Sequence, residues 1–252
     1  MARLNRELGD AAFPTISQNY FAGFEEMMYT QAFPAVIKIG SAHAGMGKAR
    51  VEDHHAMDDM RSLLAVSGGK YATCEPFVEA RCDLRIQKIG ARVRVFRRTG
   101  MSGDWKTNTG SAMIEEIAVA PRYRAWAEAA ATMFGGTTRE PLDILTVDAL
   151  IDEAGREVIL EVNGSSSGLA PDAEDEDNQH IRELVLQKMS ARLAERAATA
   201  VGAVAVKAAA AAAAEATAAG AEAAEAAEAA AAEATDTAAD GRTTAAVERD
   251  ER

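Results

Sequence analysis

The spacing of apolar and polar residues predicts a series of strands and helices between residues 33 and 196. Short apolar runs that stop at glycine are typical of buried strands, whereas apolar residues three and four positions apart indicate a helix. Because the predicted strands and helices do not alternate regularly, an α+β fold with largely antiparallel sheets is favoured over a doubly wound sheet. We expect strands at 33–40, 71–78, 83–90, 92–98, 143–150 and 157–163, and helices at 52–66, 121–134 and near 178–196.

Two of the predicted strands, 143–150 and 157–163, form a β-hairpin if residues 153–156 are its loop. Paired positions then sum to 309, which sets Asp148 directly opposite Glu161. Because side chains alternate between the faces of a strand, one face of the hairpin is apolar and the other is polar. The apolar face would carry Leu145, Val147, Ala149, Val158, Leu160 and Val162, and the polar face Thr146, Asp148, Glu161 and Asn163.

The polar face of this hairpin has the composition of a metal site. Two carboxylates held about 5 Å apart repel each other unless a cation neutralises them. Hard divalent cations prefer oxygen ligands and leave coordination positions for phosphate oxygens. We therefore expect Asp148, Glu161 and Asn163 to bind Mg²⁺ or Ca²⁺. The alternative is a solvent-facing hairpin whose charges only maintain solubility.

The segment VIKIGSAHAGMGKARV, residues 36–51, combines a lysine on a strand with a glycine-rich loop. Lys38 is held on a rigid strand, which suits contact with a phosphate group. Gly45 and Gly47 let the backbone approach an anion, and Lys48 adds a positive charge. The loop is not a Walker A motif, because alanine replaces both its first glycine and its Ser or Thr. An ordinary flexible turn is the alternative for such a loop.

Three further polar residues carry weaker signals. Glu75 precedes Pro76, whose missing backbone donor would leave this strand edge free to contact a ligand. Asp83 and Lys106 lie at a strand end and in a loop, where a solvated role is the default. The four histidines show no metal-binding spacing, and we assign them no catalytic role.

The composition argues against some classes of protein. A formal net charge of -12 and a pI near 4.9 are unlike those of nucleic-acid-binding proteins, which normally show a basic face. Cys74 and Cys82 lack a zinc-binding spacing and indicate reduced thiols in an intracellular protein. The first residues lack the apolar region of a signal peptide, and no stretch approaches the roughly 18 apolar residues of a membrane span. We therefore expect a cytoplasmic protein that does not bind nucleic acid.

Residues 197–252 form an alanine- and glutamate-rich tail of low complexity. Between positions 201 and 240, 24 of 40 residues are alanine and seven are acidic. With neither leucine nor an aromatic residue there, this stretch has little but methyl groups to bury. We therefore expect either a solvated helix or a disordered tail without a function of its own.

Four longer segments of the chain carry a resemblance to a known family. They are VIKIGSAHAGMGKARVE (36–52), YATCEPFVEARCDLRIQKIG (71–90), SGDWKTNTGSAM (102–113) and DEDNQHIRELVLQKM (175–189). Together they resemble the ATP-binding C domain of the synapsins, phosphoproteins that coat synaptic vesicles, over about residues 13–193. The resemblance implies an ATP-grasp fold over residues 32–196. It also implies that residues 1–31 are a connector or the remnant of a preceding domain that is mostly missing.

The resemblance implies a role for each matching position. The implied ATP contacts are Lys38, Lys48 and Lys106 for the phosphates, Glu75 and the backbone of Val78 for the adenine, and Asp83 for the ribose. Asp148, Glu161 and Asn163 would hold the divalent cation. In synapsins the first of these positions is typically Glu or Lys and the third is typically not Asn. The set therefore matches the metal ligands of ATP-grasp ligases more closely than those of synapsins.

Two functions follow from the resemblance. The first is ATP binding that depends on Mg²⁺ or Ca²⁺ and regulates assembly or association with vesicle and membrane surfaces, with little turnover. The second is an ATP-grasp ligase, in which a carboxylate and Mg·ATP form an acyl phosphate that an amine or thiol then attacks. The synapsin-like segments favour the first function and the metal ligands favour the second. A homo-oligomer, and a truncated chain that performs neither function, are left open.

Overall fold

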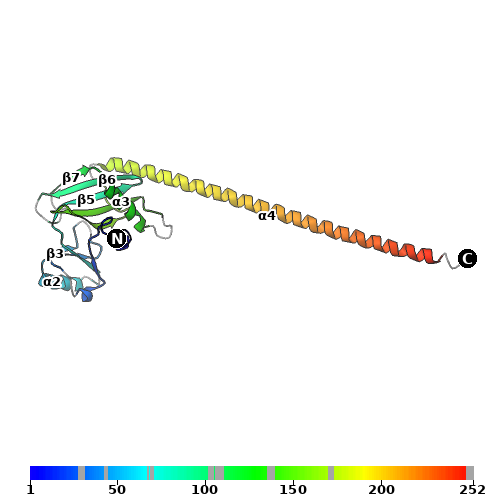
Figure 1. Cartoon of the computed structure of the whole chain (residues 1–252), viewed down its shortest axis with the longest axis horizontal. Coiled ribbons are helices and arrows are strands. Elements are labelled where there is room, and N and C mark those ends of the chain that lie inside the picture. Colours follow the sequence, from blue (N-terminus) through cyan, green and yellow to red (C-terminus); the bar gives the residue numbers. More distant parts are fainter. Residues whose placement is uncertain are drawn as a thin grey trace. The chain divides into compact units, whose positions relative to one another are not determined.

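The computed structural model describes the chain except for residues 28–31, 43–44, 67, 69–70, 102–104, 106–110, 135–139, 170–172 and 248–252, and only the backbone of 229–247. The chain divides into two units, Met1–Leu184 and Val185–Arg252 (Figure 1). The first unit holds both β-sheets, and the second is the greater part of one long helix. Among the predicted site residues, Lys106 lies outside the described residues.

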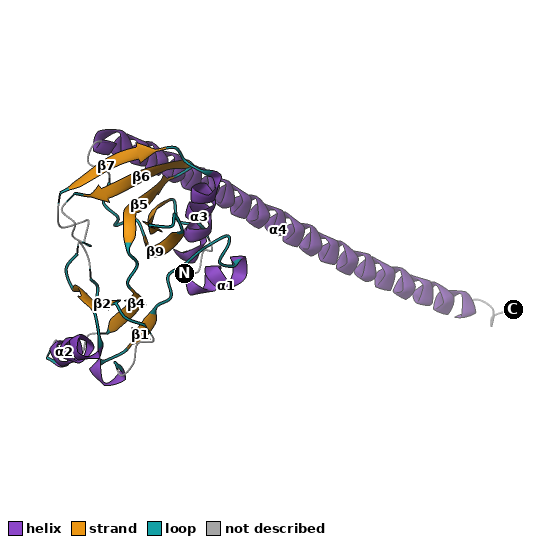
Figure 2. Ribbon diagram, turned by 60° about the vertical axis from the view of Figure 1, so that its left-hand side comes forward, coloured by secondary structure: helices purple, strands orange, loops and turns teal. Residues whose placement is uncertain are grey.

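A five-stranded antiparallel sheet forms the larger part of the first unit, in the strand order β7-β6-β5-β8-β9 (Figure 2). Its strands are β5 (Ala80–Ile89), β6 (Arg92–Gly100), β7 (Ala112–Ile117), β8 (Ile144–Asp152) and β9 (Glu157–Asn163). The helix α3 (Pro121–Ala131), which continues into η2 (Thr132–Phe134), packs on this sheet. Trp126 and Ala130 of α3 are buried in one core with Leu84 and Val147 of the sheet.

A four-stranded antiparallel sheet forms the rest of the first unit, in the order β1-β4-β2-β3. Its strands are β1 (Asn19–Phe21), β2 (Ala35–Ile39), β3 (Lys48–Val51) and β4 (Ala72–Pro76). The helix α2 (His54–Ala65) and the short η1 (Phe24–Glu26) contribute to its core, in which Ile37 and Leu64 are buried. The helix α2 starts at His54 because the Asp53 carboxylate accepts a hydrogen bond from the backbone N–H of Ala56 at 2.9 Å.

The predicted fold class is confirmed, since both sheets are antiparallel and the helices follow no regular βαβ order. Each predicted strand and helix is present, with ends that differ by a few residues, except that the helix predicted near 178–196 continues to Val247. The sequence pattern did not predict β1, β3, β7 or the N-terminal helix α1 (Ala2–Leu8). The N-terminal residues, expected to be a connector or a remnant, contribute side chains to both cores: Leu4 and Phe13 to one and Phe21 to the other.

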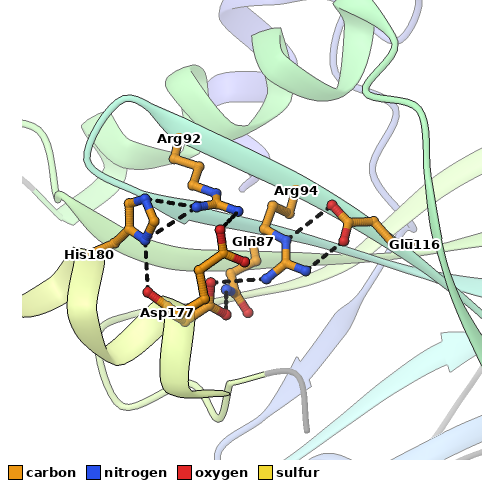
Figure 3. A network of polar contacts seen from close by, with 7 residues as sticks. Gln87, Arg92, Arg94, Glu116, Asp177 and His180 are labelled. Atoms are coloured by element: carbon orange, nitrogen blue, oxygen red, sulfur yellow. Dashed lines mark hydrogen bonds and ion pairs between the residues drawn. The ribbon is translucent and has the colours of Figure 1, made fainter. Parts of the chain in front are cut away.

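The start of helix α4 (Glu174–Val247) is fixed to the five-stranded sheet by buried charged groups (Figure 3). The side chain of Asp177 is fully buried and accepts hydrogen bonds from Gln87 Nε2 at 2.5 Å and Arg94 Nη1 at 3.0 Å. Arg94 also donates two bonds to Glu116, at 3.0 and 2.5 Å. This helix begins at Glu174 and not near 178, because four acidic residues in its first turn favour a helix N-terminus.

The second unit is helical as far as Val247, so the helical alternative for the tail is the one observed. One 18-residue window within Glu174–Glu228 has a mean hydropathy of 1.6, at most two charged residues and no burial. By length and composition alone, this helix could cross a membrane. The expectation that no stretch approaches a membrane span is therefore wrong, because a run of alanine with few charges meets that criterion without large apolar residues.

Candidate functional site

A buried ion pair links the two central strands of the four-stranded sheet. Strands β2 and β4 pair antiparallel with Val36 opposite Glu75, which brings the nearby Lys38 side chain to the Glu75 carboxylate. Lys38 Nζ lies 2.7 Å from Glu75 Oε1, and their side chains are 11% and 5% exposed. Gln18 Nε2 donates a hydrogen bond to the other oxygen at 2.7 Å. The structure therefore brings together two predicted site residues and adds Gln18, which the sequence pattern did not indicate.

A cavity of about 300 Å³ opens beside this ion pair. Lys38, Glu75, Val78, Gly45, Lys48 and Asp83 all line it, so it gathers six of the positions that the sequence predicted. Its apolar wall includes Val36, Leu150 and Leu160. Charged residues, among them Arg50 and Glu79, line the rest of it, so the cavity offers both apolar and charged contacts to a small molecule or cofactor.

The glycine-rich loop leads directly into this cavity. Gly47 has a φ of 69°, and a Cβ atom there would lie 3.2 Å from the carbonyl oxygen of Ile39. The Gly47 carbonyl accepts a hydrogen bond from the Ile39 backbone N–H at 2.8 Å, which closes the loop. Lys48 begins β3 and pairs with Lys38 on β2, so both lysines stand on neighbouring strands. The positive φ therefore favours glycine at position 47, and a Cβ atom there would crowd the Ile39 carbonyl oxygen.

The predicted hairpin register is confirmed at the polar residues. Asp148 pairs with Glu161, and Thr146 pairs with Asn163. Asn163 Nδ2 donates hydrogen bonds to Asp148 Oδ2 at 2.9 Å and to Glu161 Oε1 at 3.4 Å. The three candidate metal ligands therefore lie within contact of one another.

Beyond Asp148 the predicted pairing is wrong by one residue. A β-bulge leaves Leu160 without a partner, and Ala149 then pairs with Ile159. Ile159 is fully buried, and its backbone exchanges hydrogen bonds with residues 14 and 16. The apolar face consequently includes Ile159, whereas Leu160, predicted to be in the core, turns to the cavities.

Arg85 is the main charged neighbour of the hairpin carboxylates. Strand β5 pairs with β8 so that Arg85 lies opposite Asp148, with Nη1 3.3 Å from Oδ1. Its Nη2 donates to Ser167 Oγ at 2.5 Å and to the carbonyl oxygen of Gly168 at 2.8 Å. Burial raises the pKa of Asp148 to about 6, and the Arg85 cation acts in the opposite direction. The surroundings of Asp148 therefore stabilise its negative charge poorly. A bound cation would stabilise that charge.

A second cavity of about 320 Å³ lies over these carboxylates. It is lined by Asp148, Glu161, Arg85 and Arg98, among other residues. Lys48, Asp83 and Leu160 line both cavities, which shows that the two adjoin. Lys48 Nζ lies 4.0 Å from Glu161 Oε2 at this junction. Among the described residues, no group of three or more His, Cys, Asp or Glu side chains could hold a metal, so the candidate set is two carboxylates and one amide.

An aromatic and cationic group borders the first cavity and was not predicted. The guanidinium carbon of Arg50 lies 3.9 Å from the centroid of the Phe77 ring. The Phe77 and Trp105 rings meet edge to face with centroids 6.0 Å apart. All three residues line the cavity. They stand one or two positions from predicted site residues, but only the folded chain shows that they face the same space.

Solved structures of other proteins show which fold the first unit has. The ATP-grasp ligase PsnB, complexed with a phosphomimetic variant of a minimal precursor, Mg and ADP, matches with a TM-score of 0.52 and 16% identity, covering 73% of this chain and 56% of that one. The RimK domain protein ATP-grasp from Sphaerobacter thermophilus matches with a TM-score of 0.51 and 19% identity, covering 73% and 66%. The first unit therefore has the ATP-grasp fold.

The sequence places the chain within one family. Residues 1–191 match the family model for the synapsin ATP-binding domain. Synapsin of Drosophila melanogaster is 33% identical over 192 residues, which cover 75% of this chain and 18% of that protein. The chain belongs to the synapsin family, as the resemblance implied, and spans about a fifth of the length of this relative.

Proposed function

We propose that the first unit binds ATP together with a divalent cation across the two adjoining cavities. The observation that carries the proposal is the shared border formed by Lys48, Asp83 and Leu160. It joins a space of mixed polar and apolar lining, which contains Lys38 at 11% exposure, to a space with opposed carboxylates. An adenine ring and a charged triphosphate need these two environments side by side. The family to which the chain belongs supports the assignment.

Each part of the nucleotide has candidate contacts in the described residues. Glu75 and the backbone of Val78 would recognise the adenine, and Asp83 would lie near the ribose. Lys38 and Lys48 would neutralise phosphate oxygens, as would Lys106 from its loop, and the backbone at Gly45 and Gly47 would allow close approach of the phosphates. Because Lys38 is already paired with Glu75, its charge is held in place before the ligand arrives.

Asp148, Glu161 and Asn163 would hold the cation. Their oxygen atoms suit Mg²⁺ or Ca²⁺, and phosphate oxygens would complete the coordination. When bound, the cation would neutralise the negative charge of the phosphates. Asp148 would then exchange its contact with Arg85 for one with the cation, since Arg85 now faces the same carboxylate.

A site of this kind can bind ATP without consuming it. We propose that the chain is a synapsin-like regulatory binder, cytoplasmic and peripheral on vesicle surfaces, as the family resemblance suggests. Its second candidate function is that of a carboxylate-amine or carboxylate-thiol ligase. The complete set of metal ligands, Asp148, Glu161 and Asn163, favours this alternative. Release of phosphate from ATP by the purified chain, in the presence of candidate carboxylates, would select the ligase. If no phosphate is released, but the chain binds ATP and sediments together with vesicles, the binder is selected.

Replacing Lys48 with methionine is expected to weaken Mg·ATP binding about 10- to 100-fold in isothermal titration calorimetry. The change keeps the length of the side chain and removes a charge that lies at the border of both cavities. A charged hydrogen bond to a phosphate contributes about 1.5 to 3 kcal/mol, which corresponds to this range.

The matched control is Lys207→Met, which removes the same charge from an exposed position on α4 outside the family match. It should leave the affinity unchanged. Equal affinities for Lys48→Met and the native chain would show that phosphate binds elsewhere and would refute the proposed site.

A further inference from the structure

The second unit presents a long helix whose apolar residues are not covered. Leu186, Met189 and Leu193 are 55%, 58% and 63% exposed, and Val204 is 69% exposed. The first three are three and four positions apart, so they lie on one face of the helix. Val204 follows Leu186 after 18 residues, or about five turns, and points in the same direction. The stripe therefore runs along the helix, and alanines fill the positions between its larger residues.

The charges of this helix are divided between its two halves. From Val185 to Lys207 the charged residues are Lys188, Arg192, Glu195, Arg196 and Lys207, and from 208 to 228 they are Glu215, Glu222, Glu225 and Glu228. The first half is thus basic and the second is acidic. Such a division differs from the alternation of signs that supports an isolated helix through pairs four residues apart.

Two of the basic residues lie in line with two of the acidic residues along the helix. Arg192 and Glu228 are 36 residues apart, or about ten turns, and Lys207 and Glu225 are 18 residues apart, or about five turns. Arg196 follows Met189 by seven residues, close to two full turns, and so lies at the edge of the apolar stripe. Lys207 and Glu225 also lie 18 and 36 residues after Met189, so they continue the line of the stripe. Along this side the helix is therefore positive toward its start and negative toward its end.

We propose that this helix, from Val185 to Glu228, pairs in antiparallel orientation with the same helix of a second copy of the chain. Antiparallel pairing sets the basic half of each helix against the acidic half of the other, whereas parallel pairing would set like charges together. It covers both apolar stripes, and the small alanine side chains allow a close approach of the two axes, about 8 Å apart. The arrangement has a two-fold axis, so it closes as a dimer.

The interface differs from the nucleotide site in position and in residues. The family match ends at residue 191, so most of this helix lies beyond the synapsin domain. A negatively charged membrane surface suits the pattern less well, because it would attract the first half of the helix and repel the four glutamates of the second. A second copy of the chain complements both halves.

Two charge-reversed forms of the full chain test the pairing. In one, Glu222, Glu225 and Glu228 become lysine; in the other, Lys188, Arg192 and Arg196 become glutamate. Sedimentation equilibrium at low ionic strength should show the native chain near twice its 26.6 kDa mass. Each variant alone should dissociate with a constant raised about 100-fold, because six attractive contacts per dimer become repulsive. An equal mixture of the two variants should restore the dimer.

Circular dichroism and ATP titration of each variant serve as controls, since the exchanges should alter neither helix content nor the first unit. Recovery of the dimer in the mixture would itself show that both helices are folded. The proposal is overturned if the native chain is monomeric at every concentration, or if either variant alone dimerises as strongly as the native chain. A monomer whose sedimentation with anionic vesicles is lost when Lys188, Arg192 and Arg196 become glutamate would assign the helix to membranes and would overturn it too.

Discussion

Replacing both Asp148 and Glu161 with alanine is expected to abolish the dependence of ATP binding on divalent cations. In the native chain, Mg²⁺ should strengthen binding and EDTA should weaken it. The two carboxylates face each other across the hairpin and supply both negative charges of the candidate metal site. Loss of a single outer-shell partner typically costs a metal site 10- to 100-fold in affinity, so the loss of two direct ligands should cost at least about 100-fold. Calorimetry with Mg²⁺, Ca²⁺ and EDTA would measure the effect.

The double exchange also removes two negative charges from the chain. The effect of this change in net charge on ATP binding must be distinguished from the effect of losing the two metal ligands. A control with Glu195→Ala and Glu215→Ala makes the same change in net charge on the exposed part of α4. It should bind Mg·ATP as the native chain does. The hairpin should survive in the test variant, because its apolar face, which includes Val147 and Ile159, is untouched. An ATP affinity that still responds to Mg²⁺ after the double exchange would place the cation ligands elsewhere.

Most of the fold could be predicted because the apolar pattern is local. The strands around Ile37 and Val147 are short apolar runs, and each lies in a buried core as expected. The Asp148–Glu161 pairing could be predicted from the length of one loop. The bulge at Leu160 could not, because the buried position of Ile159 involves its backbone contacts with residues 14 and 16, far away in sequence.

The candidate site, like the fold, could be predicted from the sequence only in part. Lys38 and Glu75 could be selected individually, but their ion pair depends on the pairing of β2 with β4, which lie on either side of α2 in sequence. Arg85 could not be selected from the sequence, because its contact with Asp148 joins residues 63 positions apart. Periodicity indicates which face of a strand is buried, and it carries no information about which strand lies next to it.

Replacing Asp177 with alanine is expected to destabilise the first unit by about 3 to 5 kcal/mol. The carboxylate is fully buried, so its removal leaves the Arg94 guanidinium with Glu116 as its acidic partner and deprives Gln87 Nε2 of its acceptor. Among the described residues, Gln87 Oε1 is already a buried atom without a hydrogen bond. Removing one partner of a buried charged pair has a cost of this size because the other charge stays buried. Urea unfolding followed by the fluorescence of the buried Trp126 would measure the change.

Two further variants separate the loss of this buried contact from a general effect on α4. Glu176→Ala removes the neighbouring carboxylate, which is 53% exposed and pairs with Arg92, and it should change the free energy of unfolding little, because water screens an exposed pair. The double exchange Asp177→Leu with Arg94→Met replaces both buried charges with apolar groups of similar size and should recover much of the lost stability. Equal losses for Asp177→Ala and Glu176→Ala would show instead that the first turn of α4 contributes through its helix dipole and not through the buried pair.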